Sequence, residues 1–102
     1  MKRLEQLIAQ GEGPMLDFKK EISSVHRIAK SMVAFANHQG GTLLVGVNDN
    51  GSIYGVRAEE EKFMLEEAAR HYCYPEIDLQ IHEWNVKGKT VLEVFIPEGK
   101  EK

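Results

Sequence analysis

At 102 residues, 42% of them hydrophobic and 28% charged, the chain has the composition of a soluble globular protein, and we expect residues 1–102 to form one domain. No apolar run approaches the roughly 18 residues of a membrane helix, the amino-terminal segment has no signal-peptide core, and a single cysteine excludes a disulfide framework. We therefore expect a cytoplasmic protein with no membrane partner, either complete or one domain of a longer chain.

The net charge of −3 argues mildly against nucleic-acid binding, but the charge is unevenly distributed. Residues 15–38 hold four basic side chains against two acidic ones, whereas residues 49–83 hold three basic against nine acidic. An acidic domain of this kind can still present a basic face.

Hydrophobic periodicity predicts an alternation of helices and strands. The predicted helices are residues 2–10, 24–38 and 58–72, and the predicted strands are residues 15–21, 42–47, 52–56, 77–84 and 90–97. The apolar run at 42–47 indicates a strand buried on both faces, and Asn50-Gly51 indicates a hairpin turn that brings 52–56 back beside it. Phe63 is expected on the inner face of the last helix. The order α-β-α-β-β-α-β-β predicts an α+β fold, a two-layer domain with a mixed sheet packed with helices.

One candidate site lies in EGPMLDFKK, residues 12–20. Asp17 and Lys19 are two apart on a predicted strand, so both side chains leave the same face, and Glu12 precedes them by a short loop. Metal-dependent nucleases use an acidic-x-Lys pair in which carboxylates hold a divalent cation and the lysine balances charge. An exposed strand with an ordinary ion pair is the simpler explanation of the same spacing.

A second candidate is FANHQGGTLLVGVNDNG, residues 35–51. Local physics predicts an architectural role, in which the Gly-Gly pair turns the chain after a helix and Asn-Gly closes a hairpin. In the functional alternative, a phosphate is contacted by Asn37, His38 and the backbone amides of Gly40 and Gly41. Asp49 would add a carboxylate to that site. The pattern is not a Walker loop, and its glycines precede the strand, which disfavours a dinucleotide site.

Four basic residues form a third candidate. A phosphate backbone would be contacted by Lys19, Lys20, Arg27 and Lys30 if they gather on one face, although a solvated helix surface explains them equally well. Trp84 lies on a predicted strand, where packing is a simpler role than base stacking.

Together, EGPMLDFKK and SMVAFANHQGGTLLVGVNDNGSIYGV resemble the Schlafen-type AlbA domain, with the tightest agreement over residues 12–56. The family pattern has an acidic residue, then Glu-Phe-Lys, a helix that ends in Ala-Phe-Ala-Asn-x-x-Gly-Gly, and a strand that ends in Gly-Val-x-Asp. The resemblance implies an α+β fold and DNA binding, commonly as the amino-terminal module of a bacterial transcriptional regulator or helicase-like protein.

The resemblance also implies a possible chemistry, because animal Schlafen proteins of similar sequence include endoribonucleases with three acidic residues and a divalent metal. Carried over to this chain, the acids are Glu12, Asp17, where the family more often has Glu, and Asp49, or Asn48 if the register is one residue off. Mg²⁺ or Mn²⁺ is expected only if the domain is a nuclease.

Three functions therefore stay open. The favoured one is a module that binds DNA or RNA without a metal or catalysis. The second is a metal-dependent ribonuclease that uses Glu12, Asp17 and Asp49 with help from Lys19. The third is a dimerisation or scaffold domain whose strands pair across a two-fold axis in a homodimer.

Overall fold

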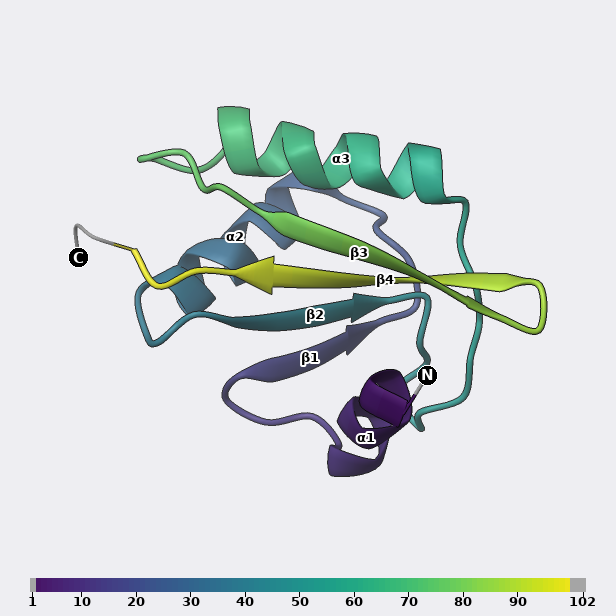
Figure 1. Ribbon diagram of the computed structural model, residues 1–102. Helices are drawn as coiled ribbons and strands as arrows, with labels where there is room; N and C mark the ends of the chain where they lie inside the picture. Colours follow the sequence, from purple (N-terminus) through teal and green to yellow (C-terminus); the bar gives the residue numbers. More distant parts are fainter. Residues whose placement is uncertain (1, 100–102) are drawn as a thin grey trace.

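The computed structural model describes residues 2–99, and within this range the chain forms three helices and four strands (Figure 1). In chain order these are α1 (Lys2–Gln10), β1 (Leu16–Lys19), α2 (Val25–Ala36), β2 (Gly41–Val45), α3 (Ala58–His71), β3 (Gln80–Val86) and β4 (Lys89–Ile96). The predicted α+β class with a mixed sheet is confirmed. The elements follow the predicted order, with one predicted strand reduced to single bridges.

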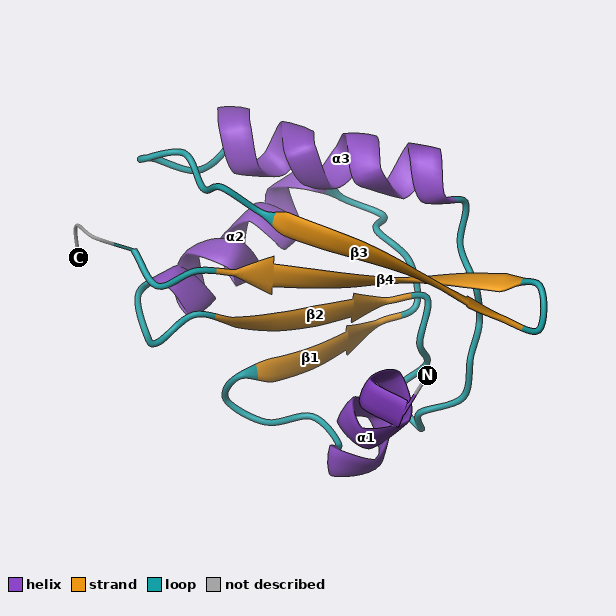
Figure 2. Ribbon diagram, in the orientation of Figure 1, coloured by secondary structure: helices purple, strands orange, loops and turns teal. Residues whose placement is uncertain are grey.

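The sheet has the strand order β1-β2-β4-β3. β1 and β2 are parallel and are connected by α2, whereas β4 is antiparallel to both β2 and β3. Figure 2 shows α2 and α3 together on one side of the sheet, with α1 apart from them beside β1. In the β1-α2-β2 unit the carboxyl end of β1 therefore lies next to the amino end of α2.

Two hydrophobic clusters lie on the two faces of the sheet. The first joins the apolar stripe of α2 and the inner face of α3 to alternate residues of β2 and β4, among them Leu43 and Leu92. The second joins Leu4 of α1 to the opposite face, including Leu44 and Val91. Leu43 and Leu44 are adjacent and both fully buried, so the prediction that this strand is buried on both faces is confirmed.

Two local predictions need correction. Residues 52–56 do not form a strand beside β2; they make isolated bridges, from Ile53 to Val47 and from Val56 to Thr90. Both edges of β2 are already taken by β1 and β4, so the returning chain can pair only beyond its end. Phe63 is 69% exposed on α3, and not on its inner face as predicted.

No helix within residues 2–99 combines the length and the apolar character that crossing a lipid bilayer requires.

Candidate functional site

Two adjoining surface depressions lie where α2 passes beside β1. The basic depression has a volume of 150 Å³ and is lined by two basic residues, Lys19 and Arg27, and one acidic residue, Glu21. The acidic depression has a volume of 290 Å³ and includes Glu12, Asp17 and His38. Ser31 lines both, so the two form one continuous strip along α2.

The basic depression sits at the carboxyl end of β1 and the amino end of α2. Ser24 caps the helix, since its Oγ accepts a hydrogen bond from the backbone N of Arg27 at 3.2 Å. Lys19 is the last residue of β1, and Arg27 belongs to the first turn of α2. This region therefore sets two cations and the positive end of a helix dipole against one carboxylate, that of Glu21, a balance that still favours an anion.

The acidic depression brings Glu12 and Asp17 into contact. Glu12 Oε2 accepts a hydrogen bond from the backbone N of Phe18 at 3.0 Å, which folds the preceding loop back along β1. A side-chain hydrogen bond with Asp17 raises the pKa of Glu12 above its usual range, and partial burial and the charges of Asp17 and Asp49 add to this effect against the opposing Phe18 amide. Lys19 Nζ lies 3.2 Å from Asp17 Oδ2, so the predicted common face of Asp17 and Lys19 is confirmed.

The charge of Asp49 reaches this pair, whereas Asn48 carries no charge. The Asn48 side chain is held in its own turn, where Nδ2 donates to Ser52 Oγ at 3.0 Å. Asp49 is exposed, and its charge contributes to the raised pKa of Glu12. The acidic residues therefore lie near one another, but among residues 2–99 no three His, Cys, Asp or Glu side chains are already gathered as a group that could hold a metal ion.

The four predicted basic residues do not form a single patch. Lys19 and Arg27 share the basic depression, whereas Lys20 Nζ lies 4.5 Å from the centre of the Tyr54 ring. Lys30 lines a different surface hollow with His26 and Tyr72. Only two of the four lie where a common anion would meet both.

Gly40 and Gly41 have a structural role. The backbone N of Gly40 donates to Phe35 O at 2.8 Å, so this amide is not free for a phosphate as the functional alternative required. Gly40 has a φ of +81°, and a Cβ there would lie 2.6 Å from Ile96 O. A Cβ on Gly41 would lie 2.3 Å from the Phe35 ring. The architectural role predicted for this pair is thus confirmed, while a phosphate contact by the Gly41 amide stays a prediction.

The end of α2 places the other two predicted residues apart from the cations. Asn37 is the exposed C-cap of the helix, and its backbone N donates to Val33 O at 2.9 Å. His38 is exposed and lines the acidic depression. His38 therefore lies nearer to the carboxylates than to Lys19 and Arg27.

Ser31 lies where the two depressions meet, and none of the candidate motifs indicated it. Helical spacing could have revealed it, because Arg27, Ser31 and His38 fall at i, i+4 and i+11 and so share one side of the helix. The Ser31 Oγ lies 3.4 Å from Arg27 O.

A family model named Schlafen, AlbA_2 matches residues 12–102. The chain belongs to the Schlafen, AlbA_2 family. The matched range contains both depressions and every predicted site residue, whereas α1 lies before it. Membership confirms the resemblance inferred from the motifs at 12–20 and 31–56.

Two solved structures have a similar fold. The DIP2311 protein from Corynebacterium diphtheriae superposes with a TM-score of 0.65 at 20% identity over 98% of this chain, which spans 22% of that protein. The N-terminal domain of a RecG-related protein from Nitrosomonas europaea, named for its relation to ATP-dependent DNA helicases, has a TM-score of 0.58 at 24% identity over 95% of this chain and 71% of that domain. At these identities the likeness concerns the fold alone. No curated protein matches the chain.

Proposed function

We propose that this domain binds nucleic acid, and that Lys19 and Arg27 contact the phosphate backbone at the amino end of α2. The observation that carries the proposal is the basic depression itself, in which these two cations meet a capped helix start. Membership of the Schlafen, AlbA_2 family supports it, as does the likeness to a domain named for its relation to DNA helicases.

The charge distribution sets the expected character of this binding. Lysine and arginine that neutralise phosphates release condensed counterions, so affinity falls as salt rises. The domain as a whole carries −3, which opposes association with a polyanion. We therefore expect binding that is weak for the isolated domain and readily detected only at low salt.

Fluorescence anisotropy of labelled DNA and RNA, measured at several salt concentrations, tests the proposal. Replacing both Lys19 and Arg27 with alanine should reduce the slope of log affinity against log salt by about 1.4 on a single strand, since each phosphate contact contributes about 0.7. Lys30→Ala removes a charge from the same helix outside the basic depression and serves as the control. Absence of binding at low salt, or an equal effect of Lys30→Ala, would contradict the proposal.

A metal-dependent nuclease is the second candidate, and one observation favours it. Glu12 and Asp17 are in contact and the charge of Asp49 reaches Glu12, so a divalent cation that drew the three carboxylates together would offset their mutual repulsion. Their oxygen atoms are the ligands that Mg²⁺ and Mn²⁺ prefer, and when bound the ion would polarise a phosphate or activate water. Lys19, in contact with Asp17, would then face the phosphate.

Incubation of structured RNA, single-stranded DNA and duplex DNA with the domain and Mn²⁺ separates the two candidates. A nuclease should cleave at least one substrate, and Asp17→Asn should abolish cleavage while leaving binding at Lys19 and Arg27 in place. Intact substrates at high protein concentration would eliminate the nuclease candidate.

A homodimer through the free sheet edges also stays a prediction, which sedimentation of the domain would test.

A further inference from the structure

The face of β3 and β4 that turns away from α2 and α3 is partly open. On this face α1 packs over Leu44 and Val91. The cluster that it forms does not include Gln80 and Phe95, which pair at the end of the β3-β4 hairpin away from its turn. A cavity of 610 Å³ lies there, within the roughly 300–1,000 Å³ typical of ligand sites. Phe95 is 43% exposed beside it, although it belongs to a strand whose neighbours are buried. A large aromatic side chain in this position leaves much of its ring surface open to solvent.

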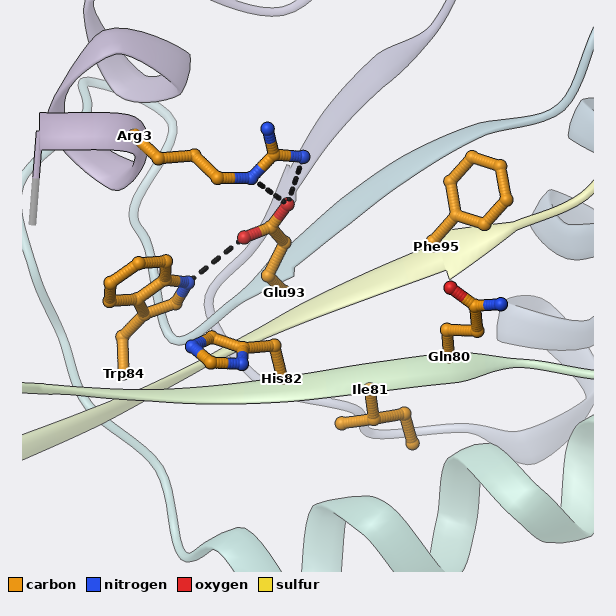
Figure 3. Close-up of a pocket in the computed structure, with 7 residues that line it drawn as sticks. All are labelled: Arg3, Gln80, Ile81, His82, Trp84, Glu93 and Phe95. Atoms are coloured by element: carbon orange, nitrogen blue, oxygen red, sulfur yellow. Dashed lines mark hydrogen bonds and ion pairs between the residues drawn. The ribbon is translucent and has the colours of Figure 1, made fainter.

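The strand register sets several planar side chains on this face. Gln80 lies opposite Phe95. The next pair on the same face is His82 of β3 and Glu93 of β4. Trp84 follows after another two residues and lies opposite Val91. Figure 3 shows these side chains on the same side of the hairpin, with Ile81 pointing the other way, toward α3. We call Gln80, His82, Trp84 and Phe95 the aromatic face.

Hydrogen bonds hold Trp84 in a defined orientation. Its indole Nε1 donates to Glu93 Oε1 at 2.9 Å, and the His82 ring meets it at a centroid distance of 4.5 Å and an angle of 67°. Phe95 is four residues from Val91 along β4, about 13 Å at the usual rise of a strand. The two largest rings are therefore too far apart to stack on each other. Phe95 is exposed to a ligand, whereas Trp84 is half-buried against the cluster under α1 and offers a ligand only its outer surface.

The charges at this cavity do not repel a polyanion. Glu93 is buried, and its Oε2 accepts from Arg3 Nε at 3.0 Å and Nη2 at 2.8 Å. The guanidinium offsets the carboxylate, and Arg3 itself is largely exposed. Although the domain has a net charge of −3, Glu93 is the one acidic residue among the lining residues that the structure describes, and it is paired with Arg3.

We propose that the aromatic face binds the bases of single-stranded nucleic acid by stacking a base on Phe95 and packing another against the outer surface of Trp84, with the Gln80 amide beside Phe95 available for hydrogen bonds to a base edge. The inference rests on the proposed function, and it names the form of nucleic acid. Aromatic side chains on an exposed sheet stack on bases of single strands, whereas a duplex keeps its base faces covered. Lys19 and Arg27 lie toward the other face of the sheet, so the two contributions can be tested separately.

Trp84 provides a direct probe, because it is the only tryptophan of the chain. A single-stranded oligothymidylate should quench its fluorescence in a saturable manner at low salt, while a duplex of the same length should not. Free tryptophan amide, titrated in parallel, controls for absorption by the oligonucleotide. Quenching of equal strength by the duplex would overturn the proposal.

Substitutions at Phe95 separate stacking from other forms of contact. Phe95→Ala should weaken single-strand binding by about 5- to 160-fold, the equivalent of 1–3 kcal/mol per stacked base. Phe95→Tyr retains the ring and should bind as the wild type does, whereas Phe95→Leu retains only apolar bulk and should bind as weakly as the alanine variant. Phe63→Ala removes the exposed aromatic of α3 and should have no effect. Far-UV circular dichroism checks that each variant is folded.

The remaining outcomes distinguish this inference from the proposed function. Binding that depends on Lys19 and Arg27 but neither quenches Trp84 nor responds to Phe95→Ala would overturn the stacking proposal and leave the proposed function standing. If Phe95→Leu binds as tightly as the wild type, the face supplies apolar contact and the stacking proposal is wrong. Absence of any binding at low salt would overturn both.

Discussion

Glu61 is an acidic side chain buried in the first turn of α3. Its Oε1 accepts a hydrogen bond from the backbone N of Ile22 at 2.7 Å, which ties the loop before α2 to α3. Burial raises the pKa of Glu61, the charges of Glu21 and Glu60 raise it further, and the Ile22 hydrogen bond acts in the opposite direction. The carboxylate therefore has a structural function that comes with an electrostatic cost.

We predict that Glu61→Ala lowers the free energy of unfolding by about 1–3 kcal/mol at pH 7, because the buried Ile22 amide loses its acceptor. Glu61→Gln keeps an acceptor oxygen and should cost less. Urea denaturation of both variants, compared with the wild type, measures the difference. Equal losses for the two variants would contradict this role of the hydrogen bond.

The pH dependence of stability gives a second test of the same residue. Because the pKa of Glu61 is raised on folding, the folded state binds this proton more tightly, and stability falls as pH rises from the unfolded to the folded pKa. Glu61→Gln should therefore gain stability relative to the wild type as pH rises from about 4 to 7. Glu59→Gln, an exposed change in the same turn, controls for the lost charge. Parallel pH curves for Glu61→Gln and the wild type would refute the prediction.

The sequence indicates where Glu61 lies on its helix, but it does not indicate the distant residue to which the Glu61 carboxylate is hydrogen-bonded. Three consecutive glutamates, residues 59–61, stand in the first turn of α3, and helical spacing relates Glu61 to the buried Leu65. The partner amide at Ile22 is 39 positions away, and no local pattern indicates it. The same limit applies to the basic residues, since their separation between Tyr54, α2 and β1 depends on where distant segments meet.

α1 is the element that stands before the part of the chain matched by the family model. It nevertheless takes part in the core, because Leu4 is 1% exposed and packs with Phe18 and Leu44. Its attachment is reinforced by Arg3, whose ion pair with Glu93 crosses from the helix to β4. We therefore regard α1 as an integral layer and not as a loose extension.

We predict that Leu4→Ala lowers the free energy of unfolding by about 2–5 kcal/mol, because it leaves a cavity between α1 and the sheet. Gln6→Ala, an exposed change on the same helix, should stay within about 0.5 kcal/mol of the wild type. Urea denaturation followed by Trp84 fluorescence measures both. A loss as small as that of the control would mean that α1 does not contribute to the stability of the core.

At the scale of elements, helices were predicted well and strand pairing less well. The stripe of Leu4, Leu7 and Ile8 predicted α1 with its observed limits, since a helix is defined by local spacing. The return strand at 52–56 was predicted from a sound hairpin signal, because Asn48 and Ser52 do close that turn. What the local signal lacked was the arrival of β4, more than 30 residues later, at the remaining edge of β2.

The whole molecule has two hydrophobic clusters that share one sheet, and their connection decides whether the domain unfolds as a unit. Leu43 belongs to the cluster under α2 and α3, whereas Leu44 belongs to the cluster under α1. Both side chains are fully buried, and they leave opposite faces of the same strand. Because β2 and β4 contribute to both clusters, loss of packing on one face should disturb the backbone that supports the other.

We predict that Leu43→Ala and Leu44→Ala each lower the free energy of unfolding by about 2–5 kcal/mol, and that each does so in a single transition. Trp84 reports on the face near α1, while far-UV circular dichroism is dominated by the helices, two of which lie on the other face. Coincident midpoints from the two probes are expected for both variants, since the shared strands couple the clusters. A Trp84 transition at a lower urea concentration than the circular dichroism transition in Leu44→Ala would contradict this coupling, because α1 and its cluster would then unfold separately. The aromatic face, which includes Trp84, would in that case lose its fixed geometry before the basic depression at the start of α2 does.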